Sequence, residues 1–465
     1  MKLKTTGKIL CLVVALVMVI GLAACNKTPA PSSDSGDSKP ADTQKTEDTK
    51  PAEEKPAAKE VKIKFFSNLP DRTANQGKLE QMLIDNYLKE NPNVKIEIEA
   101  LQDEPYQQKF KAYMASNDLP DFYMIWGSSS YFGPVMKSGY AAELNKDDYK
   151  DYGFFPGSTD GFSMDGKLYG LPRNTDFMVL YINKKLFEDN GVKIPETYQD
   201  LIEASKVFRA KGIAPNAMNG KDQWNIAILY QNLASMINGD PKLVYKTLSR
   251  ETTFAGEESL AKAAEMVKSL MDVKFFQDSF TAADYGAANN LFAQEKAAMY
   301  YMGAWEMGMA SNESFPESFR KNVAAIPFPV VEGGKGKATD LLAWNGGGYA
   351  VSSKSQVKDE AIKLLNYFFA PENWAKNAWQ MGVTVPAQNY EKYLTGSETE
   401  LQKQLTKILS SSTSLSGFPW MDSSTPGFKV ATELLSQELA AGVKTPAQFI
   451  EECDKAADKA AKEGK

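Results

Sequence analysis

The stretch VKIKFFSNLPDRTANQGKLEQMLIDNYLKENPNVKIEIE, residues 61–99, switches between two periodicities. Apolar side chains occupy alternate positions at its start and at its end, as they do in half-buried strands. Between these strands, Leu79, Leu83 and Tyr87 are spaced as on one face of a helix, and the segment Asn91-Pro92-Asn93 ends that helix. A strand, a helix and a second strand in this order predict a βαβ unit and therefore an α/β sheet.

The remainder of the chain is too long for a single core. From about Val61 onward the composition is globular, and some 400 residues exceed one comfortable hydrophobic core, so we expect two lobes. The chain carries 53 basic and 59 acidic residues, a formal net charge of −6. Nucleic acid is therefore not an expected partner.

The absence of histidine excludes many chemistries. Without His, the chain has no Ser-His-Asp or Cys-His arrangement, no His-based zinc site and no imidazole acid or base. Hydrolysis by a pair of carboxylates stays open. The acidic clusters at residues 145–151 and 160–165 lack the regular oxygen ligands and closing Glu of a calcium loop. We expect no enzyme activity, no cofactor and no metal.

The N-terminus has the pattern of an export signal. Lysines precede an apolar run at residues 9–20, and Leu22-Ala23-Ala24 then lead to Cys25. This pattern resembles the lipobox of bacterial lipoproteins, which implies a signal peptide at residues 1–24 and a lipid on Cys25. Residues 25–60 are Pro-, Ser- and charge-rich, so we expect a disordered linker up to the globular body. A plain N-terminal membrane anchor with an incidental cysteine is the alternative.

Six stretches, in order along the chain, resemble one known family: NYLKENPNVKIEIEAL (86–101), ASNDLPDFYMIWG (115–127), DGKLYGLPRNTDFMVLYINKKLFEDNGVKIPETYQDL (165–201), FAQEKAAMYYMGAWEMG (292–308), WNGGGYAVS (344–352) and LLNYFFAPENWAKNAWQMGVTVPA (364–387). They are similar to the extracellular solute-binding proteins of ABC sugar importers, which include maltose-binding protein. The resemblance implies a two-lobed periplasmic-binding-protein fold of type II with hinge strands and a ligand cleft. The expected lobes are residues 61–175 with 345–395, and residues 176–344 with 396–465.

The same resemblance implies how the protein works. It would be a monomer that captures a carbohydrate, expected to be an oligosaccharide, and hands it to the permease subunits of an importer. With lipid on Cys25, it would sit on the outer face of a Gram-positive cell membrane, and a Gram-negative periplasm stays open. The same fold binding a peptide or a polyamine is an alternative, and a surface glycoside hydrolase is another.

Sugars present C–H faces and hydroxyl edges, so a sugar cleft needs aromatic rings beside planar hydrogen-bonding groups. Trp126 ends a predicted strand at the sheet edge where α/β proteins bind ligands, with a core position as the alternative. Trp305 follows a predicted strand at residues 297–302 and matches the family's usual stacking tryptophan. Asp176 matches a crossover acid that binds sugar hydroxyls in the family, and a salt bridge with Arg173 is its alternative.

Further candidates come from loops and element ends. Trp224 begins a predicted helix, Trp344 and Asn345 precede a triple glycine, and Trp420 lies in an irregular segment. Asn68 directly follows the first strand and equally suits a helix N-cap. The predicted ligand-binding set is thus Asn68, Trp126, Arg173, Asp176, Trp224, Trp305, Trp344, Asn345 and Trp420. By contrast, Trp374 and Trp379 are expected in the core.

Overall fold

The computed structural model describes residues 59–463. The predicted signal peptide, Cys25 and nearly all of the linker lie outside these residues. Within residues 59–463, no helix is long and apolar enough to cross a membrane. The two predicted strands and the helix of the opening βαβ unit are confirmed as β1 (Val61–Ser67), α1 (Asn75–Glu90) and β2 (Val94–Ala100).

The opening unit folds for the reasons that its sequence suggests. In β1, Ile63 and Phe65 are buried while Lys62 and Lys64 are exposed, which matches a strand with one face on the core. At the end of α1, both the backbone N–H and the side-chain amide of Asn91 donate to the carbonyl of Tyr87. These bonds satisfy a carbonyl that the helix end leaves free, and Pro92 does not continue the helix.

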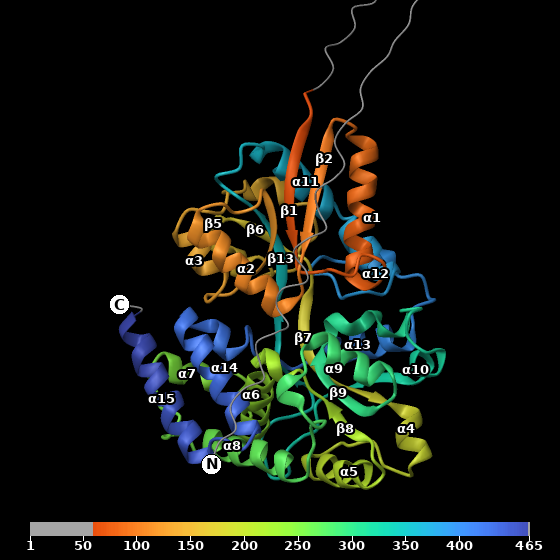
Figure 1. Ribbon diagram of the computed structural model, residues 1–465, viewed down its shortest axis with the longest axis vertical. Coiled ribbons are helices and arrows are strands. Elements are labelled where there is room, and N and C mark those ends of the chain that lie inside the picture. Colours follow the sequence, from red (N-terminus) through yellow and green to blue (C-terminus); the bar gives the residue numbers. More distant parts are fainter. Residues whose placement is uncertain (1–58, 464–465) are drawn as a thin grey trace, which may run out of the picture. The chain divides into compact units, whose positions relative to one another are not determined.

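The first lobe is built on a five-stranded sheet in the order β2-β1-β3-β13-β6 (Figure 1). Strands β1, β2 and β3 are parallel, whereas β13 runs antiparallel to both β3 and β6. The remaining strands of this sheet are β3 (Phe122–Trp126), β6 (Gly170–Pro172) and β13 (Gly347–Val351). The helices that belong to this lobe are α1, α2 (Asp103–Ser116), α3 (Phe132–Lys137), α11 (Lys358–Phe369) and α12 (Trp374–Gln380).

The second lobe is built on a sheet in the order β10-β7-β9-β8, with β12 also paired to β7. Eight of the nine residues of β7 are buried, because helices and neighbouring strands surround this central strand. The strands are β7 (Thr175–Asn183), β8 (Ala214–Ala217), β9 (Ala297–Gly303), β10 (Val323–Ile326) and β12 (Ala343–Asn345). The helices are α4 (Lys184–Asp189), α5 (Tyr198–Ala210), α6 (Trp224–Asn238), α7 (Leu243–Leu248), α8 (Glu258–Asp272), α9 (Tyr285–Ala293), α10 (Glu317–Asn322), α13 (Glu400–Ser410), α14 (Pro426–Ala440) and α15 (Pro446–Glu463).

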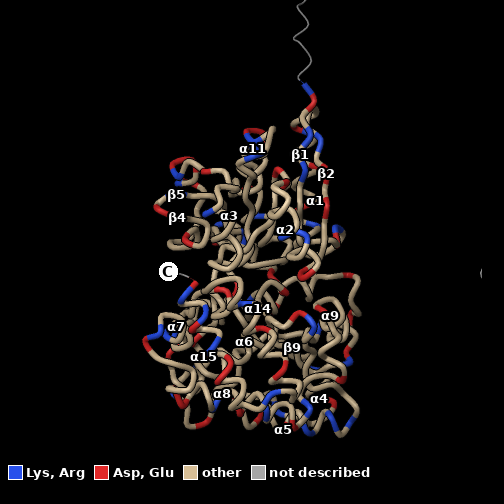
Figure 2. The backbone as a smooth tube through the Cα atoms, turned by 60° about the vertical axis from the view of Figure 1, so that its left-hand side comes forward, with Lys and Arg blue, Asp and Glu red and all other residues tan. Residues whose placement is uncertain are grey.

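Short elements complete the two lobes. The small strands are β4 (Ser163–Met164), β5 (Lys167–Leu168), β11 (Asp340–Leu341) and β14 (Ser414–Leu415). The 3₁₀ helices are η1 (Lys146–Tyr149), η2 (Asp160–Phe162), η3 (Gly220–Asp222), η4 (Phe280–Ala282), η5 (Ala304–Ala310), η6 (Glu391–Tyr393) and η7 (Trp420–Ser423). Basic and acidic residues are interspersed over both lobes (Figure 2), and many pair on exposed surface, where an ion pair contributes little stability.

The chain crosses between the sheets at positions that matter for the site. It leaves β6 at Pro172 and enters β7 at Thr175, so Arg173 and Asn174 lie at the crossing. It returns between β12 and β13 through Gly346, where a Cβ atom would lie 1.7 Å from Oδ2 of Asp176. The backbone must therefore pass this carboxylate closely, which only glycine allows. The residue boundaries of the two lobes stay a prediction.

Candidate functional site

A cavity of about 370 Å³ opens between side chains of the two lobes, and we call it the cleft. Its size lies within the range of small-molecule sites in proteins. Strands lead into it, since Asn68 follows β1, Trp126 ends β3 and Trp305 lies just past β9. Seven of the predicted residues line it: Asn68, Trp126, Arg173, Asp176, Trp224, Trp305 and Trp344.

Three tryptophans of the second lobe form an aromatic row in the cleft. The ring of Trp305 lies 6.0 Å from that of Trp224 and 6.0 Å from that of Trp344, measured between centroids. Trp305 can take this place because Gly303 has no side chain: a Cβ atom there would lie 2.0 Å from the indole. The row offers apolar surface on which the C–H faces of a ring-shaped solute can stack.

The first lobe contributes a second aromatic surface around Trp126. Its ring centroid lies 5.0 Å from Tyr131 and 5.7 Å from Tyr106. Tyr106 is fully buried and donates to the carbonyl of Met124, so it provides a fixed support for the half-buried Trp126. The cleft therefore has aromatic rings on both lobes.

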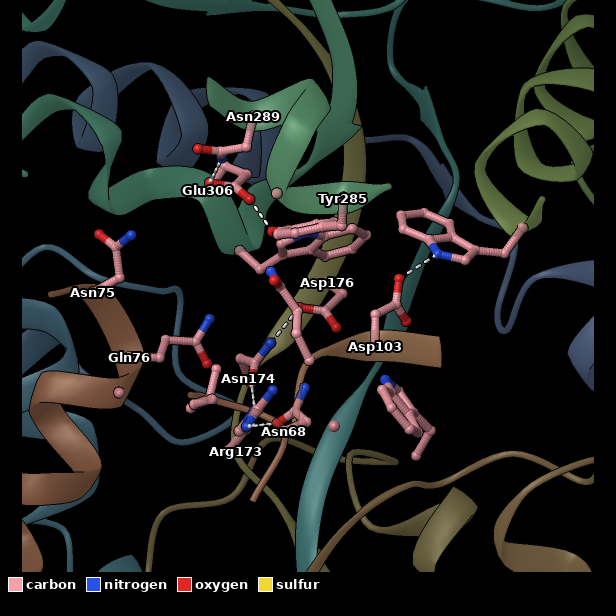
Figure 3. A pocket seen from close by; sticks show the side chains of 18 of the residues that line it. Asn68, Asn75, Gln76, Asp103, Arg173, Asn174, Asp176, Tyr285, Asn289 and Glu306 are labelled. Atoms are coloured by element: carbon pink, nitrogen blue, oxygen red, sulfur yellow. Dashed lines mark hydrogen bonds between the residues drawn. The ribbon is translucent and has the colours of Figure 1, made fainter. Parts of the chain in front are cut away.

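A hydrogen-bonded chain of side chains crosses between the lobes (Figure 3). Nη1 of Arg173 donates to Oδ1 of Asn68 at 3.1 Å, and Nε donates to Oδ1 of Asn174 at 3.1 Å. The amide nitrogen of Asn174 then donates to Asp176. Asn174 thus joins Arg173 to Asp176 in place of the direct salt bridge that was the alternative for this pair. Burial raises the pKa of Asp176 to about 7, against the opposing effect of Arg173.

A second carboxylate is buried at the cleft wall. Glu306 is only 4% exposed, and it accepts hydrogen bonds from the hydroxyl of Tyr285 and from Nδ2 of Asn289. Burial raises the pKa of Glu306 to about 8. Sequence reasoning missed these three residues. The available signal was the charged position of Glu306 directly after Trp305, at the end of a buried strand.

A hydrogen bond spans the cleft from lobe to lobe. Nε1 of Trp224, the first residue of α6, donates to Oδ2 of Asp103, the first residue of α2, at 2.9 Å. Burial raises the pKa of Asp103. A second contact of this kind joins Ser130, whose backbone N–H donates to the carbonyl of Asp422 at 3.1 Å. Both contacts exist only while the lobes are together.

We expect Trp224→Phe to weaken ligand binding about tenfold, because the variant keeps an aromatic ring but leaves half-buried Asp103 without its donor from the other lobe. Calorimetric titration of the variant measures this loss. In an Asp103→Ala background, Trp224→Phe should cause no further loss, because the bond is already absent. Equal additional losses in both backgrounds would contradict a role for this hydrogen bond.

Two predicted contacts are corrected by the structure. Trp420 does not line the cleft: its side chain is fully buried, and Nε1 donates to the carbonyl of Ala227 at 2.9 Å. Its neighbours Met421 and Asp422 line the cleft instead. Asn345 also lies outside the lining, where it accepts a hydrogen bond from the hydroxyl of Thr175 at 3.4 Å. Its side chain serves the pairing of β12 with β7.

Trp374 and Trp379 lie in the core, as predicted. Trp374 also supports the site indirectly, because its Nε1 donates to the backbone carbonyl of Arg173 at 2.7 Å. Trp379 stacks on Tyr390 with 4.3 Å between centroids. The described part of the chain has no group of three or more Asp, Glu, His or Cys side chains that could hold a metal ion.

Comparisons with known proteins agree with this architecture. The family model of bacterial extracellular solute-binding proteins matches residues 70–373. The multiple sugar-binding protein of Streptococcus mutans is 25% identical over 362 residues, 76% of each chain. A structure from a study of xylan utilization by the thermophilic bacterium Caldanaerobius polysaccharolyticus has a TM-score of 0.78 at 27% identity, over 85% of this chain and 99% of that chain. A chitin oligosaccharide binding protein has a TM-score of 0.76 at 24% identity, over 87% and 99%. This chain therefore belongs to the bacterial extracellular solute-binding protein family and has its two-lobed α/β fold.

Proposed function

We propose that the protein captures an oligosaccharide outside the cell and delivers it to the permease of an ABC importer. The observation that carries this proposal is the row of Trp224, Trp305 and Trp344 beside the buried polar groups of Asp176 and Glu306. Aromatic rings suit the C–H faces of sugar rings, while carboxylates and amides suit their hydroxyl groups. The relatives support the assignment, since they include a multiple sugar-binding protein and a chitin oligosaccharide binding protein.

Binding and delivery are linked through closure of the lobes. Ligand groups that contact both lobes favour the closed arrangement, and a ligand shifts the equilibrium only by its difference in affinity for the two states. The bonds between Trp224 and Asp103 and between Ser130 and Asp422 add to the closed state. The permease subunits would then recognise the surface that the two closed lobes form together. We infer that the receptor acts as a monomer and does not cleave its ligand.

The N-terminal sequence supports an anchor for this receptor. A cysteine that follows an apolar run and small residues is the pattern of a lipidated cysteine, and several acyl chains on Cys25 would hold the protein at the outer face of a Gram-positive cell membrane. The polar residues up to about 60 would then give the lobes reach above the membrane. The anchor leaves the cleft accessible from outside.

The test is a titration of the purified full chain with xylo-, chito-, malto- and galacto-oligosaccharides. We expect a saturable change in tryptophan fluorescence with at least one series, because the ligand covers the rings of the aromatic row. The recovered sugar should have its original length on chromatography. Shortened products would identify a glycoside hydrolase, and saturation by peptides or polyamines alone would identify another solute.

A further inference from the structure

The N-terminus of α1 faces the cleft, and neither its N-cap residue nor its first turn supplies a carboxylate. Residues 74–77 all line the cavity, and Ala74 at the N-cap has no side chain that could accept from the helix. The first turn of α1 contains no acidic residue. Within the described residues, the backbone N–H groups of Asn75, Gln76 and Gly77 have no acceptor. Free N–H groups and the helix dipole together give this end a positive potential.

Two other helices that begin at the cleft, α2 and α9, differ in this respect, whereas α6 resembles α1 in having no acidic residue in its first turn. Asp103 lies in the first turn of α2, and the carboxylate of Asp284 accepts from the backbone N–H of Ala287 at the start of α9. Both helices therefore carry their own negative group. At α1, the nearest carboxylate is that of Asp71, which lies before the helix at the cleft and accepts hydrogen bonds from Thr73 and from the backbone of Ala74 rather than from the first turn.

The amide of Gln76 points into the cleft from this helix end (Figure 3). The residue is 5% exposed, and its Oε1 has no hydrogen-bond partner among the described residues. A buried amide without a partner is costly, since it has lost its water and gained nothing in return. Oε1 is an acceptor and cannot bind an anion, but Nε2 of the same amide also has no acceptor among the described residues and can donate to a ligand oxygen in the cleft.

Arg173 lies beside this helix end and is also 5% exposed. In the described part of the chain its guanidinium forms no ion pair, and its Nη2 has no hydrogen-bond acceptor. The Oδ1 atom of Asn68 accepts from Arg173, so the amide nitrogen of Asn68 remains to donate into the cleft. Nη1 also donates to the hydroxyl of Tyr349 at 3.5 Å, and the nearest cleft carboxylate, Asp176, is reached only through Asn174. An anion in the cleft would give this buried guanidinium a direct partner.

We propose that the α1 N-terminus, Asn68, Gln76 and Arg173 form an anion subsite, which binds a charged oxygen group on the sugar. The group is a carboxylate, as in a uronic acid unit, or a phosphate ester. Backbone N–H groups and a guanidinium with free N–H donors suit both anions. This inference rests on the proposed function and narrows it from oligosaccharides in general to acidic ones. Asp176 then binds hydroxyl groups of the same ligand from the other end of the Asn174 bridge.

The test uses matched pairs of sugars on the full chain. The pairs are trigalacturonate with galactotriose, xylotriose with and without a glucuronate branch, and maltotriose with and without a terminal phosphate. Calorimetry at low and moderate salt measures each affinity. We expect the acidic member of at least one pair to bind at least about tenfold more tightly, with an advantage that falls as salt rises. A response of only the phosphate pair assigns the subsite to phosphate.

Two variants distinguish loss of the anion subsite from a general loss of affinity for all sugars. Arg173→Gln should remove the preference for the acidic sugar and change the affinity of its neutral partner much less. Gln76→Glu keeps Arg173 but places a negative charge at the helix end. This variant should bind the neutral sugar more tightly than the acidic one. Lys185→Gln removes one exposed positive charge on α4, outside the cleft lining, and is the control for net charge. This variant should keep the preference for the acidic sugar.

The outcomes distinguish this inference from the proposed function. If neutral and acidic members bind equally in every pair, or if both variants weaken both members equally, the anion subsite is wrong while an oligosaccharide receptor stands. If no sugar of either kind binds, the proposed function itself is wrong, and the anion subsite falls with it.

Discussion

Trp305→Ala should lower the affinity for oligosaccharide by at least about 2 kcal/mol, or about 30-fold, as expected for a central aromatic contact. Trp305 is the middle ring of the aromatic row, with both neighbouring centroids 6.0 Å away. Its loss removes stacking surface and also the support of Trp224 and Trp344. Calorimetric titration with the best ligand of the panel measures the change.

Two further variants make this result specific to the ring. Trp305→Phe retains an aromatic face and should lose only part of the affinity. Trp379→Phe changes a core tryptophan outside the cleft and should leave the affinity unchanged. A normally folded Trp305→Ala protein with full affinity would show that the ring does not bind the ligand.

The fold was predictable because its signals are local. Alternation of apolar and polar side chains over a few residues predicted β1 and β2, and the Asn-Pro-Asn segment predicted where α1 ends. The same locality explains why Asn68, Trp126 and Trp305 line the cleft, since each follows or ends a strand that a short pattern identifies. The C-terminal edges of such strands are where α/β folds bind ligands.

Other parts of the site depend on contacts between distant segments. Asp103 enters the cleft because α2 and α6 begin opposite each other, and the bond to Trp224 joins residues 121 positions apart. Gln76 has no distinguishing neighbour in the sequence, and only the uncapped start of α1 makes it significant. No short pattern contains this information, because each feature arises from how the elements pack.

Trp420 is a residue that the sequence wrongly placed in the cleft, because an irregular and glycine-containing segment suggested a ring exposed to ligand. Trp420 instead begins the 3₁₀ helix η7, and its ring packs among Tyr230, Phe254 and Phe428, with centroids 5.8, 5.5 and 5.6 Å away. Loop sequence does not specify which side of the backbone faces the core. That choice follows from the position of α6 and α14 around η7.

Trp420→Ala should lower the free energy of unfolding by about 3–5 kcal/mol, the range for removal of a large buried aromatic side chain. The substitution opens a cavity between these three rings and removes the hydrogen bond to the carbonyl of Ala227. Chemical denaturation followed by circular dichroism measures the loss. Because Met421 and Asp422 line the cleft, collapse of this cavity would disturb binding secondarily.

Trp420→Phe separates packing from binding, because it keeps most of the buried surface. It should still lower the free energy of unfolding, by about 1–2 kcal/mol from lost contacts and the lost hydrogen bond, with ligand affinity nearly unchanged. Trp305→Ala should show the reverse pattern, a large loss of affinity with little loss of stability, because that ring is half-buried in the cleft. If Trp420→Phe instead lost affinity at full stability, Trp420 would be a ligand contact after all, and the closed state that binds the ligand would have to expose a ring that is buried here.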